Sequence, residues 1–285
     1  MKLRIHHLIK LSFFLSLFLI LNSGFAATIK VLTWNIRYDN AGDSLNSWQH
    51  RKENVTAQLA KYAPEIIGLQ EVLRSQLDYL QSRLNTYSHF GVGRDDGKEA
   101  GEYAPIFFNK FRFTAIDSGY FWLSENPSAA VKGWDAACIR ICTWVRLQDN
   151  QDKSTLFVFN THLDHAGEKA RNESALLIRD KIRAISGRDP VLMMGDFNCT
   201  DDTKAYADLT AGKFLLDCRK TTIVPPEGPQ FTFSGFDVKG KHGGVIDHIL
   251  YRKFGKVLKY KIINDNKDGR YFSDHLPVFI EIAPD

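Results

Sequence analysis

The stretch that most constrains what this chain can fold into is a short apolar run that ends in an acid and an amide. Residues 191–194 (Val-Leu-Met-Met) follow Pro190, and Gly-Asp-Phe-Asn occupies positions 195–198. A short apolar run bounded by Pro and Gly is typical of a buried strand. Asp196 and Asn198 would then stand at the mouth of a sheet, where α/β folds place their chemistry. Asp and Asn also begin ordinary loops, so this stretch alone leaves both interpretations open.

The same arrangement recurs along the chain. Three further apolar runs end in polar side chains, and one polar cluster precedes a last apolar run. Each run delivers one or two side chains that hydrolytic enzymes use, and this recurrence favours a catalytic site over a set of unrelated loops. The runs are 31–35 with Asn35, 66–71 with Glu71, 157–162 with His162, and 276–282 with Asp274 and His275 before it.

The motifs at these positions resemble the endonuclease/exonuclease/phosphatase superfamily, whose members include the deoxyribonuclease I-like enzymes. One such tetrapeptide is a weak signal, whereas six of them in family order are specific, and the match spans about residues 28–282. The resemblance implies an α/β fold: a four-layer α/β sandwich with two packed mixed β-sheets flanked by helices. The motifs are TWNIR at 33–37, LQEV at 69–72, NTHLDH at 160–165, GDFN at 195–198, IDHI at 246–249 and SDHLP at 273–277.

Local patterns agree with strands that alternate with helices, which predicts two packed sheets with helices outside. Residues 47–62 predict a helix with Ser47 as its N-cap. Ser-Gln-Leu-Asp at 75–78 resembles a capping box and predicts the start of another helix. Two apolar runs, 245–251 and 257–263, predict a hairpin near the end of the chain.

The first 26 residues have the composition of a secretory signal peptide. Three basic residues precede an apolar run at 11–21, and Gly-Phe-Ala at 24–26 offers small residues before a cut. The run is shorter than the roughly 20 residues of a membrane span, so a retained anchor is the lesser alternative. We expect 1–26 to be a signal peptide, 27–285 to be the catalytic domain of a bacterial exported member of the superfamily, and the protein to be periplasmic or secreted without a stable membrane span after processing.

Net charge bears on the class of partner. The chain has 37 Lys and Arg against 33 Asp and Glu. Without Lys2, Arg4 and Lys10 of the expected signal peptide, 34 basic residues face 33 acidic ones, a net charge of +1. Dedicated nucleic-acid binders are often much more basic, so composition neither demands nor excludes a polyanionic partner. We expect one large domain and a monomer.

Cysteine spacing leaves one question open. Cys138 and Cys142 would be about 13 Å apart in a strand, which is too far for a bond between them. Cys199 and Cys218 flank a predicted helix and could meet. An exported protein permits a disulfide, so a Cys199–Cys218 bond and free buried thiols are equal alternatives.

The resemblance implies roles for individual residues. Phosphate-ester hydrolysis requires charge neutralisation at phosphorus, an activated water and a stabilised leaving oxygen. Mg²⁺, or alternatively Mn²⁺, prefers carboxylate and other oxygen ligands. Glu71, supported by Asn35 and completed by Asp274, is the implied metal site. Asp196 would orient and activate the water, and Asn198 would fix the substrate phosphate.

Two His–carboxylate pairs complete the predicted site. His275 would be oriented by Asp247, since carboxylates commonly fix the tautomer of a catalytic His. His162, with Glu102 behind it, would donate to a phosphate oxygen or protonate the leaving group. Glu102 belongs to the Gly- and charge-rich loop 91–102, so a solvated loop carboxylate is the alternative for this residue.

The substrate contacts are less defined. Arg140 stands where the family often supplies an Arg that faces the substrate phosphate, although it could equally bond a local carboxylate. Directly before Ile246 and Asp247 the family frequently has a basic residue, whereas this chain has Val245, which puts a phosphate contact from that position in doubt. His165 and His242 have no family role and are predicted to be surface histidines.

These features predict a metal-dependent phosphoesterase that hydrolyses phosphodiester or phosphomonoester bonds. A nuclease is the first hypothesis within that class. A phosphatase or phosphodiesterase acting on lipid head groups or small phosphates is the second. A catalytically silent binding protein is the alternative from another class, and the presence of Glu71, Asp196 and His275 argues against it.

Overall fold

The computed structural model describes residues 28–240 and 243–285, so the predicted signal peptide and His242 lie outside the described residues. The strands are β1 (Ile29–Asn35), β2 (Ile66–Gln70), β3 (Tyr87–Phe90), β4 (Ile106–Asn109), β5 (Phe113–Trp122), β6 (Ile141–Asp149), β7 (Thr155–His162), β8 (Val191–Asp196), β9 (Leu216–Asp217), β10 (Asp247–Arg252), β11 (Lys256–Ile262), β12 (Asn266–Lys267), β13 (Arg270–Tyr271) and β14 (Val278–Ala283). The helices are η1 (Ala41–Asn46), α1 (Trp48–Tyr62), α2 (Arg74–Arg83), α3 (Glu168–Ser186), α4 (Lys204–Thr210), η2 (Ala211–Lys213) and α5 (Cys218–Thr221).

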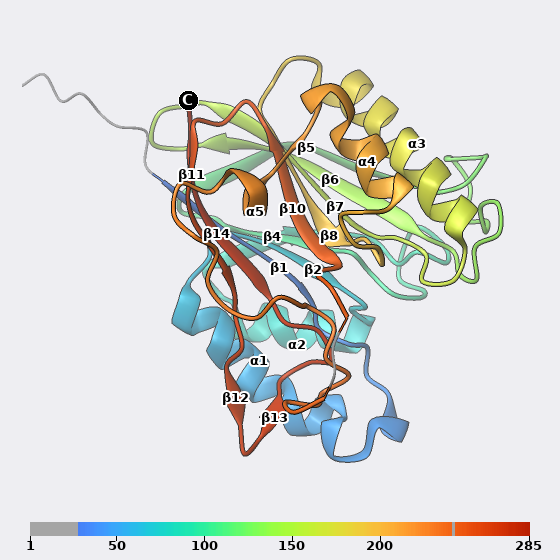
Figure 1. Ribbon diagram of the computed structural model, residues 1–285, viewed down its shortest axis with the longest axis vertical. Helices are drawn as coiled ribbons and strands as arrows, with labels where there is room; N and C mark the ends of the chain where they lie inside the picture. The colour runs from blue at the N-terminus through green and yellow to red at the C-terminus, as the bar shows by residue number, and fades with distance from the viewer. Residues whose placement is uncertain (1–27, 241–242) are drawn as a thin grey trace, which may run out of the picture.

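Two six-stranded sheets stack at the centre of the molecule (Figure 1). The first has the order β11-β14-β1-β2-β4-β3 and the second β5-β6-β7-β8-β10-β9. Each sheet holds one parallel pair, β1–β2 or β7–β8, among antiparallel neighbours. Helices α1 and α2 lie on the outer side of the first sheet, and α3 and α4 on the outer side of the second. The predicted four-layer α/β sandwich with two mixed sheets is confirmed.

Apolar side chains fill the three spaces between these layers, because strand residues alternate between the two faces of a sheet. In β8, Leu192 and Met194 enter the core between the sheets, whereas Val191 and Met193 join the core beneath α3. A third core separates the first sheet from α1 and α2. Burial on both faces explains why the central strands are continuous apolar runs in the sequence.

A layer of buried polar side chains joins the two sheets. Gln70 Nε2 on β2 donates to Asn160 Oδ1 on β7 at 2.7 Å and to Thr33 Oγ1 at 3.0 Å. Asn160 Nδ2 donates to the carbonyl oxygens of Leu69 at 2.8 Å and Pro105 at 3.0 Å. A buried polar group that loses its hydrogen bond is costly. These hydrogen bonds therefore fix how one sheet is placed on the other.

The predicted hairpin of 245–251 and 257–263 is wrong. β10 pairs with β8 and β9, while β11 pairs with β14 in the other sheet. The chain crosses between the sheets after Arg252, where Lys253 has a positive φ of 55°. Two neighbouring apolar runs satisfy a hairpin pattern, but the pattern does not say which sheet takes each strand.

The helix caps also differ from the prediction. Ser47 is at the N-cap of α1, but its side chain makes no capping hydrogen bond. α2 begins at Arg74, before the predicted capping box at 75–78, which is therefore wrong. Instead, Gln76 Oε1 accepts from the Leu73 N–H at 3.0 Å. The same buried amide also donates from Nε2 to the Arg37 carbonyl oxygen, in the segment after β1.

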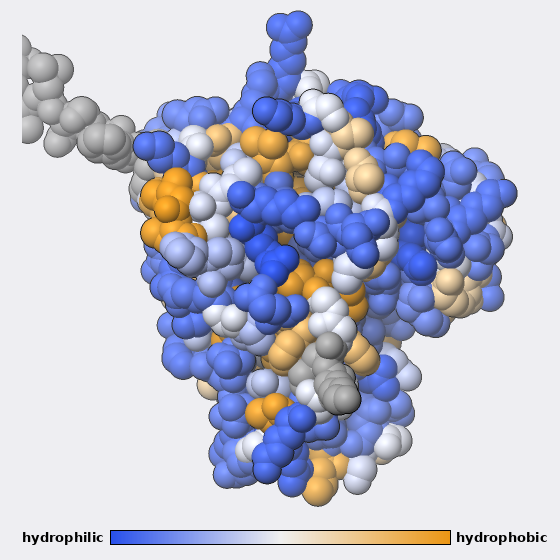
Figure 2. Space-filling model, in the orientation of Figure 1, coloured by the Kyte–Doolittle hydropathy of each residue, from blue (hydrophilic) through white to orange (hydrophobic). Residues whose placement is uncertain are grey.

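The surface and the cysteines bear on two further expectations. On the face shown in Figure 2, hydrophilic residues predominate and apolar residues form small patches among them. Within residues 28–240 and 243–285, no helix combines the length and apolarity needed to cross a membrane. All four cysteines are described and all are free thiols, so Cys199 and Cys218 do not form a disulfide.

Candidate active site

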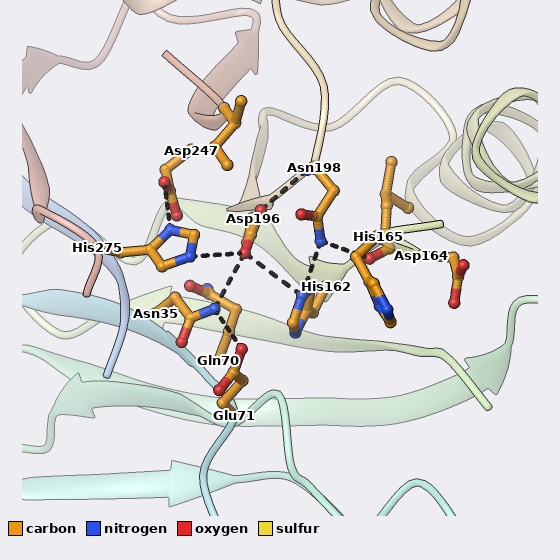
Figure 3. Close-up of polar contacts among 12 residues, drawn as sticks. Asn35, Gln70, Glu71, His162, Asp164, His165, Asp196, Asn198, Asp247 and His275 are labelled. Carbon is orange, nitrogen blue, oxygen red and sulfur yellow. Dashed lines mark hydrogen bonds and ion pairs between the residues drawn. The ribbon is translucent and has the colours of Figure 1, made fainter. Parts of the chain in front are cut away.

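The polar segments predicted from the sequence meet at one end of the sandwich (Figure 3). They surround a pocket of about 540 Å³ between the ends of the two sheets. Asn35 and Asp247 lie behind the pocket wall, and the other predicted site residues line it. Those lining residues are Glu71, Glu102, Arg140, His162, Asp196, Asn198, Asp274 and His275.

Asp196, the last residue of β8, lies at the centre of this arrangement and is 1% exposed. Its Oδ2 accepts a hydrogen bond from Asn35 Nδ2 at 3.0 Å and lies 3.4 Å from His162 Nε2 and 3.6 Å from His275 Nε2. Its Oδ1 accepts from the Asn198 N–H at 2.9 Å. Burial raises the pKa of Asp196 to about 7, against the opposing effect of His275. A carboxylate in this state can take up a proton near neutral pH.

The backbone around Asp196 is unusual in ways the site requires. Gly195 has a φ of 149°, and a Cβ on it would lie 2.0 Å from the Thr161 carbonyl oxygen of β7. Glu71 and Asn198 have φ values of 59° and 48°, in the left-handed region that residues other than Gly rarely adopt. Such conformations cost of order 1–3 kcal/mol each and gather at functional sites.

The two histidines lie on opposite sides of Asp196 (Figure 3) and carry different charges. His275 Nδ1 is 2.9 Å from Asp247 Oδ2, so the predicted pair is present in the structure. Burial alone would lower the pKa of His275, but Asp247 and Asp196 outweigh it and raise this pKa well above its ordinary value. Burial, followed by the charge of Arg140, lowers the pKa of His162 well below its ordinary value. His162 is therefore neutral and His275 cationic.

Glu102 lies in the same pocket as His162 but has another partner. Its Oε2 is 2.6 Å from Arg94 Nη1. His162 Nδ1 is buried without a hydrogen-bond partner among the described residues, so the predicted Glu102–His162 pair is not formed as a hydrogen bond. The reason is that Arg94, from the same loop, forms an ion pair with the Glu102 carboxylate.

Arg140 meets both of its alternatives, because it lines the pocket and also bonds a local carboxylate. It is 4% exposed, with Nε 3.4 Å from Asp164 Oδ2 and Nη2 3.0 Å from His165 Nδ1. His165 is exposed, as expected for a surface histidine, yet it lines the pocket as well. Asp164 accepts four backbone N–H groups, which lower its pKa to about 2 although burial opposes this change.

The residues predicted to hold a metal offer hard oxygen donors. Glu71 Oε1 accepts from Asn35 Nδ2 at 3.0 Å and Oε2 from Tyr38 N–H at 3.1 Å. Arg37 Nη1 lies 3.9 Å from Glu71 Oε2, and Arg37 Nε lies 3.8 Å from Asp274 Oδ2. Burial, with Glu71 contributing, raises the pKa of Asp274. The Arg37 guanidinium thus lies between the carboxylates of Glu71 and Asp274. Carboxylate oxygens of this kind fit a divalent ion.

Two further groups of potential metal donors occur in the described residues. The donor atoms of Asp196, Asp247 and His275 lie within 4.8 Å of one another, as do those of Cys138, Asp164 and His165. In the first group, the hydrogen bond between Asp247 and His275 already engages two of the three residues. Glu71 and Asp274 belong to neither group, and their role as metal ligands stays a prediction from the sequence.

Several lining residues had no role assigned from the sequence. Arg37 and Tyr38 follow β1, and Arg37 is part of the TWNIR motif, so a signal was present. Arg94 lies in a loop whose glycines and charges indicated only exposure. Phe233 is 45% exposed, with its ring centroid 5.1 Å from that of His275. No periodic pattern marks such an isolated aromatic.

Comparison with models of protein families shows which family this chain belongs to. A model of the endonuclease/exonuclease/phosphatase family matches residues 32–275. The chain belongs to the endonuclease/exonuclease/phosphatase family. Enzymes of this family depend on divalent metals and hydrolyse phosphate esters, so membership together with the arrangement of the polar side chains around Asp196 supports a phosphoric ester hydrolase.

Solved structures of family members superpose closely. An endonuclease/exonuclease/phosphatase from Bacteroides vulgatus is 40% identical, with a TM-score of 0.87, and the match covers 91% of this chain and 100% of that one. A mannosyl-6-phosphatase from Bacteroides thetaiotaomicron is 32% identical, with a TM-score of 0.86, and the match covers 90% and 99% of the two chains.

Two of the curated relatives are more distant and longer. An uncharacterized mimivirus protein, R895, is 26% identical over 81% of this chain and 41% of its own length. Human tyrosyl-DNA phosphodiesterase 2 is 26% identical over 60% of this chain and 42% of its own length. The chain thus spans less than half the length of either relative.

Proposed function

We propose that this protein is a divalent-metal-dependent phosphatase that acts on a small phosphomonoester. The observation that carries the proposal is the pocket of about 540 Å³ around Asp196, which is within the range of small-molecule sites. The likeness to a mannosyl-6-phosphatase over nearly all of that chain supports it. We further propose Mg²⁺, with Mn²⁺ as the alternative, and export directed by residues 1–26.

The chain's own residues can carry the reaction. A divalent cation at Glu71 and Asp274 would neutralise charge on the phosphate oxygens. Asp196, with a pKa of about 7, is placed to accept a proton from the attacking water at Oδ2. The cationic His275 can donate from Nε2 to a phosphate oxygen. Fixed donors of this kind stabilise developing charge without reorganisation.

The opposite side of the phosphate position is formed by Asn198 and His162. Asn198 Nδ2 is 2.9 Å from His162 Nε2 and 3.0 Å from the Leu163 carbonyl oxygen. The amide therefore donates to an unprotonated ring nitrogen, which agrees with a neutral His162. A bound phosphate would be held between this neutral side and the cationic His275.

The proposal is tested by phosphate release from purified protein. Substrates are a hexose 6-phosphate, 4-nitrophenyl phosphate, bis(4-nitrophenyl) phosphate, DNA and RNA. We expect turnover of the monoesters with Mg²⁺ or Mn²⁺, loss of it in EDTA and recovery on adding metal. Glu71→Gln should lower the rate at least about 10²-fold, whereas Glu53→Gln, an exposed acid on α1, should not. Turnover that is insensitive to EDTA, or no release from any monoester with either metal, would contradict the proposal.

A phosphodiesterase acting on nucleic acid is the second candidate. The exposed ring of Phe233 beside His275 favours it, because bases stack on such aromatic faces. The name of the human relative, tyrosyl-DNA phosphodiesterase 2, points the same way. Cleavage of DNA or RNA without release of phosphate from monoesters would establish this candidate in place of the first.

A further inference from the structure

Charged side chains line the part of the pocket beside His162. Four side chains form it, here named the charged wall: Arg94, Glu102, Arg140 and His165. Figure 3 shows His165 and Asp164 on the far side of His162 from His275. We infer that the charged wall binds the hydroxyl groups of the leaving alcohol, so that the substrate is the phosphate ester of a neutral polyhydroxylated alcohol such as a hexose. This inference rests on the proposed function and names its substrate class.

The charge balance of the wall favours a neutral ligand. Each arginine already has a carboxylate partner, Arg94 with Glu102 at 2.6 Å and Arg140 with Asp164 at 3.4 Å. Asp95 Oδ1 adds a further negative charge 3.8 Å from Arg94 Nε. A second phosphate on the substrate would approach three carboxylates and two paired arginines. A hydroxyl group, which both donates and accepts, can bond to either member of such a pair.

The wall has hydrogen-bonding capacity left over for those hydroxyls. Arg94 lines the pocket, and its guanidinium has five N–H donors, of which one at Nη1 bonds the Glu102 carboxylate. Among the described residues, only Arg94 donates a hydrogen bond to the Glu102 carboxylate. A carboxylate has about four acceptor positions, so Glu102 can accept further hydrogen bonds from a ligand. His165 Nδ1 accepts from Arg140, which leaves its proton on Nε2 as a donor.

The loop that carries Arg94 and Glu102 is held in place before any ligand binds. The Arg94 N–H donates to the Glu102 carbonyl at 3.1 Å, and the Asp95 N–H to the Ala100 carbonyl at 3.0 Å. Trp122 Nε1 on β5 donates to the Arg94 carbonyl oxygen at 2.6 Å. Fixing a binding group in advance lowers the entropy lost on binding, as expected of a specificity site.

The first test compares two substrates that share the phosphate but differ in the alcohol. The ratio of kcat/KM for a hexose 6-phosphate to kcat/KM for 4-nitrophenyl phosphate should fall at least tenfold in Arg94→Met and recover in part in Arg94→Lys. Arg74→Met is the matched control, because Arg74 pairs with Glu99 of the same loop but lies outside the pocket; its ratio should be that of the wild type. Circular dichroism checks that each variant folds.

Three results would overturn the inference. One is an equal loss of kcat/KM for both substrates in Arg94→Met, which would show that Arg94 only maintains the structure of the pocket. Another is a preference of the wild type for a hexose 1,6-bisphosphate over the monophosphates, which would make the wall a second phosphate site. The third is the failure of D-mannose and D-glucose to bind.

Binding of the free sugars separates this inference from the proposed function. Titration calorimetry of D-mannose and D-glucose in EDTA requires neither metal nor turnover. We expect millimolar binding of at least one hexose by the wild type, at least tenfold weaker in Arg94→Met and retained in His275→Ala. Sugar binding without any phosphatase activity would refute the proposed function and keep the charged wall, whereas phosphatase activity without sugar binding would do the reverse.

Discussion

At the scale of single residues, two buried aspartates show how neighbours decide the state of a carboxylate. Asp196 receives one backbone N–H and one amide and lies near Asp247, and burial raises its pKa to about 7. Asp164 is buried as well, but four backbone N–H groups lower its pKa to about 2. The first can exchange a proton during turnover. The second is a permanent anion that ties the loop at 135–140 to the start of α3.

The low pKa of Asp164 predicts a pH-dependent contribution to stability. Because its folded pKa of about 2 lies below the unfolded value of 3.8, the contribution is present above pH 4 and is lost as the pH falls through about 2. Its size should be about 2 kcal/mol. Asp164→Asn should unfold at lower urea concentration than the wild type at pH 7, and this difference should shrink toward pH 2.5. An unchanged difference, or the same behaviour in Asp180→Asn on α3, would contradict the assignment.

The sequence made some site residues predictable and left others hidden, for physical reasons. Asp196, His162 and His275 stand at the ends of apolar runs, and a strand end is visible as a change from apolar to polar residues. Arg94 belongs to a loop that owes its shape to backbone pairing with its own far end, and no periodicity reports such pairing. The partner of Glu102 was therefore mistaken although its place in the pocket was not.

At the scale of elements, a buried arginine on α1 joins the segments that carry the predicted metal ligands. Arg51 is 3% exposed. Its Nη2 donates to the Arg37 carbonyl oxygen at 2.6 Å, and its Nη1 donates to the Ile36 carbonyl and, at 3.3 Å, to the Phe272 carbonyl. Burial lowers the pKa of Arg51 to about 10, so it stays cationic at neutral pH. One guanidinium thus connects the end of β1 to the segment before Asp274.

Removing this connection should weaken metal binding more than it weakens the fold. Arg51→Met leaves buried carbonyls without donors, which costs about 1–3 kcal/mol of stability, and lets the end of β1, which carries Asn35, move relative to the segment before Asp274. We expect the Mg²⁺ concentration for half-maximal activity to rise at least about tenfold, the effect of a displacement that costs about 1.4 kcal/mol. Arg83→Met at the exposed end of α2 is the control. Unchanged Mg²⁺ dependence in a destabilised Arg51→Met would show a structural role alone.

Element existence was more predictable than element pairing. The helix predicted over residues 47–62 is present as α1, over Trp48–Tyr62. By contrast, β10 and β11 entered different sheets because their neighbours are set by the whole sandwich. Likewise, the predicted capping box at 75–78 failed, and Gln76 serves tertiary contacts as well as its own helix.

At the scale of the whole molecule, the small net charge predicts how activity responds to salt. The chain without residues 1–26 carries 34 basic against 33 acidic residues, a net charge of +1. Binding of a small ester through few contacts should be nearly insensitive to salt, so we expect kcat/KM for monoesters to change less than about threefold between 50 and 500 mM KCl. If DNA is cut, the logarithmic slope should correspond to about one to three phosphates. A steeper slope would indicate a long polyanion as the natural substrate.

The position of Arg37 between Glu71 and Asp274 has a consequence for the metal-free protein. These carboxylates have a counter-ion of their own, and Arg37 also bonds Asp43 at 3.0 Å. At the proposed metal site, binding of a divalent ion would exchange one cation for another, and the released guanidinium would keep a partner in Asp43. After chelation, Arg37 again serves as the counter-ion of these carboxylates, so we expect the metal-free protein to stay folded and to regain activity on addition of metal without a refolding delay.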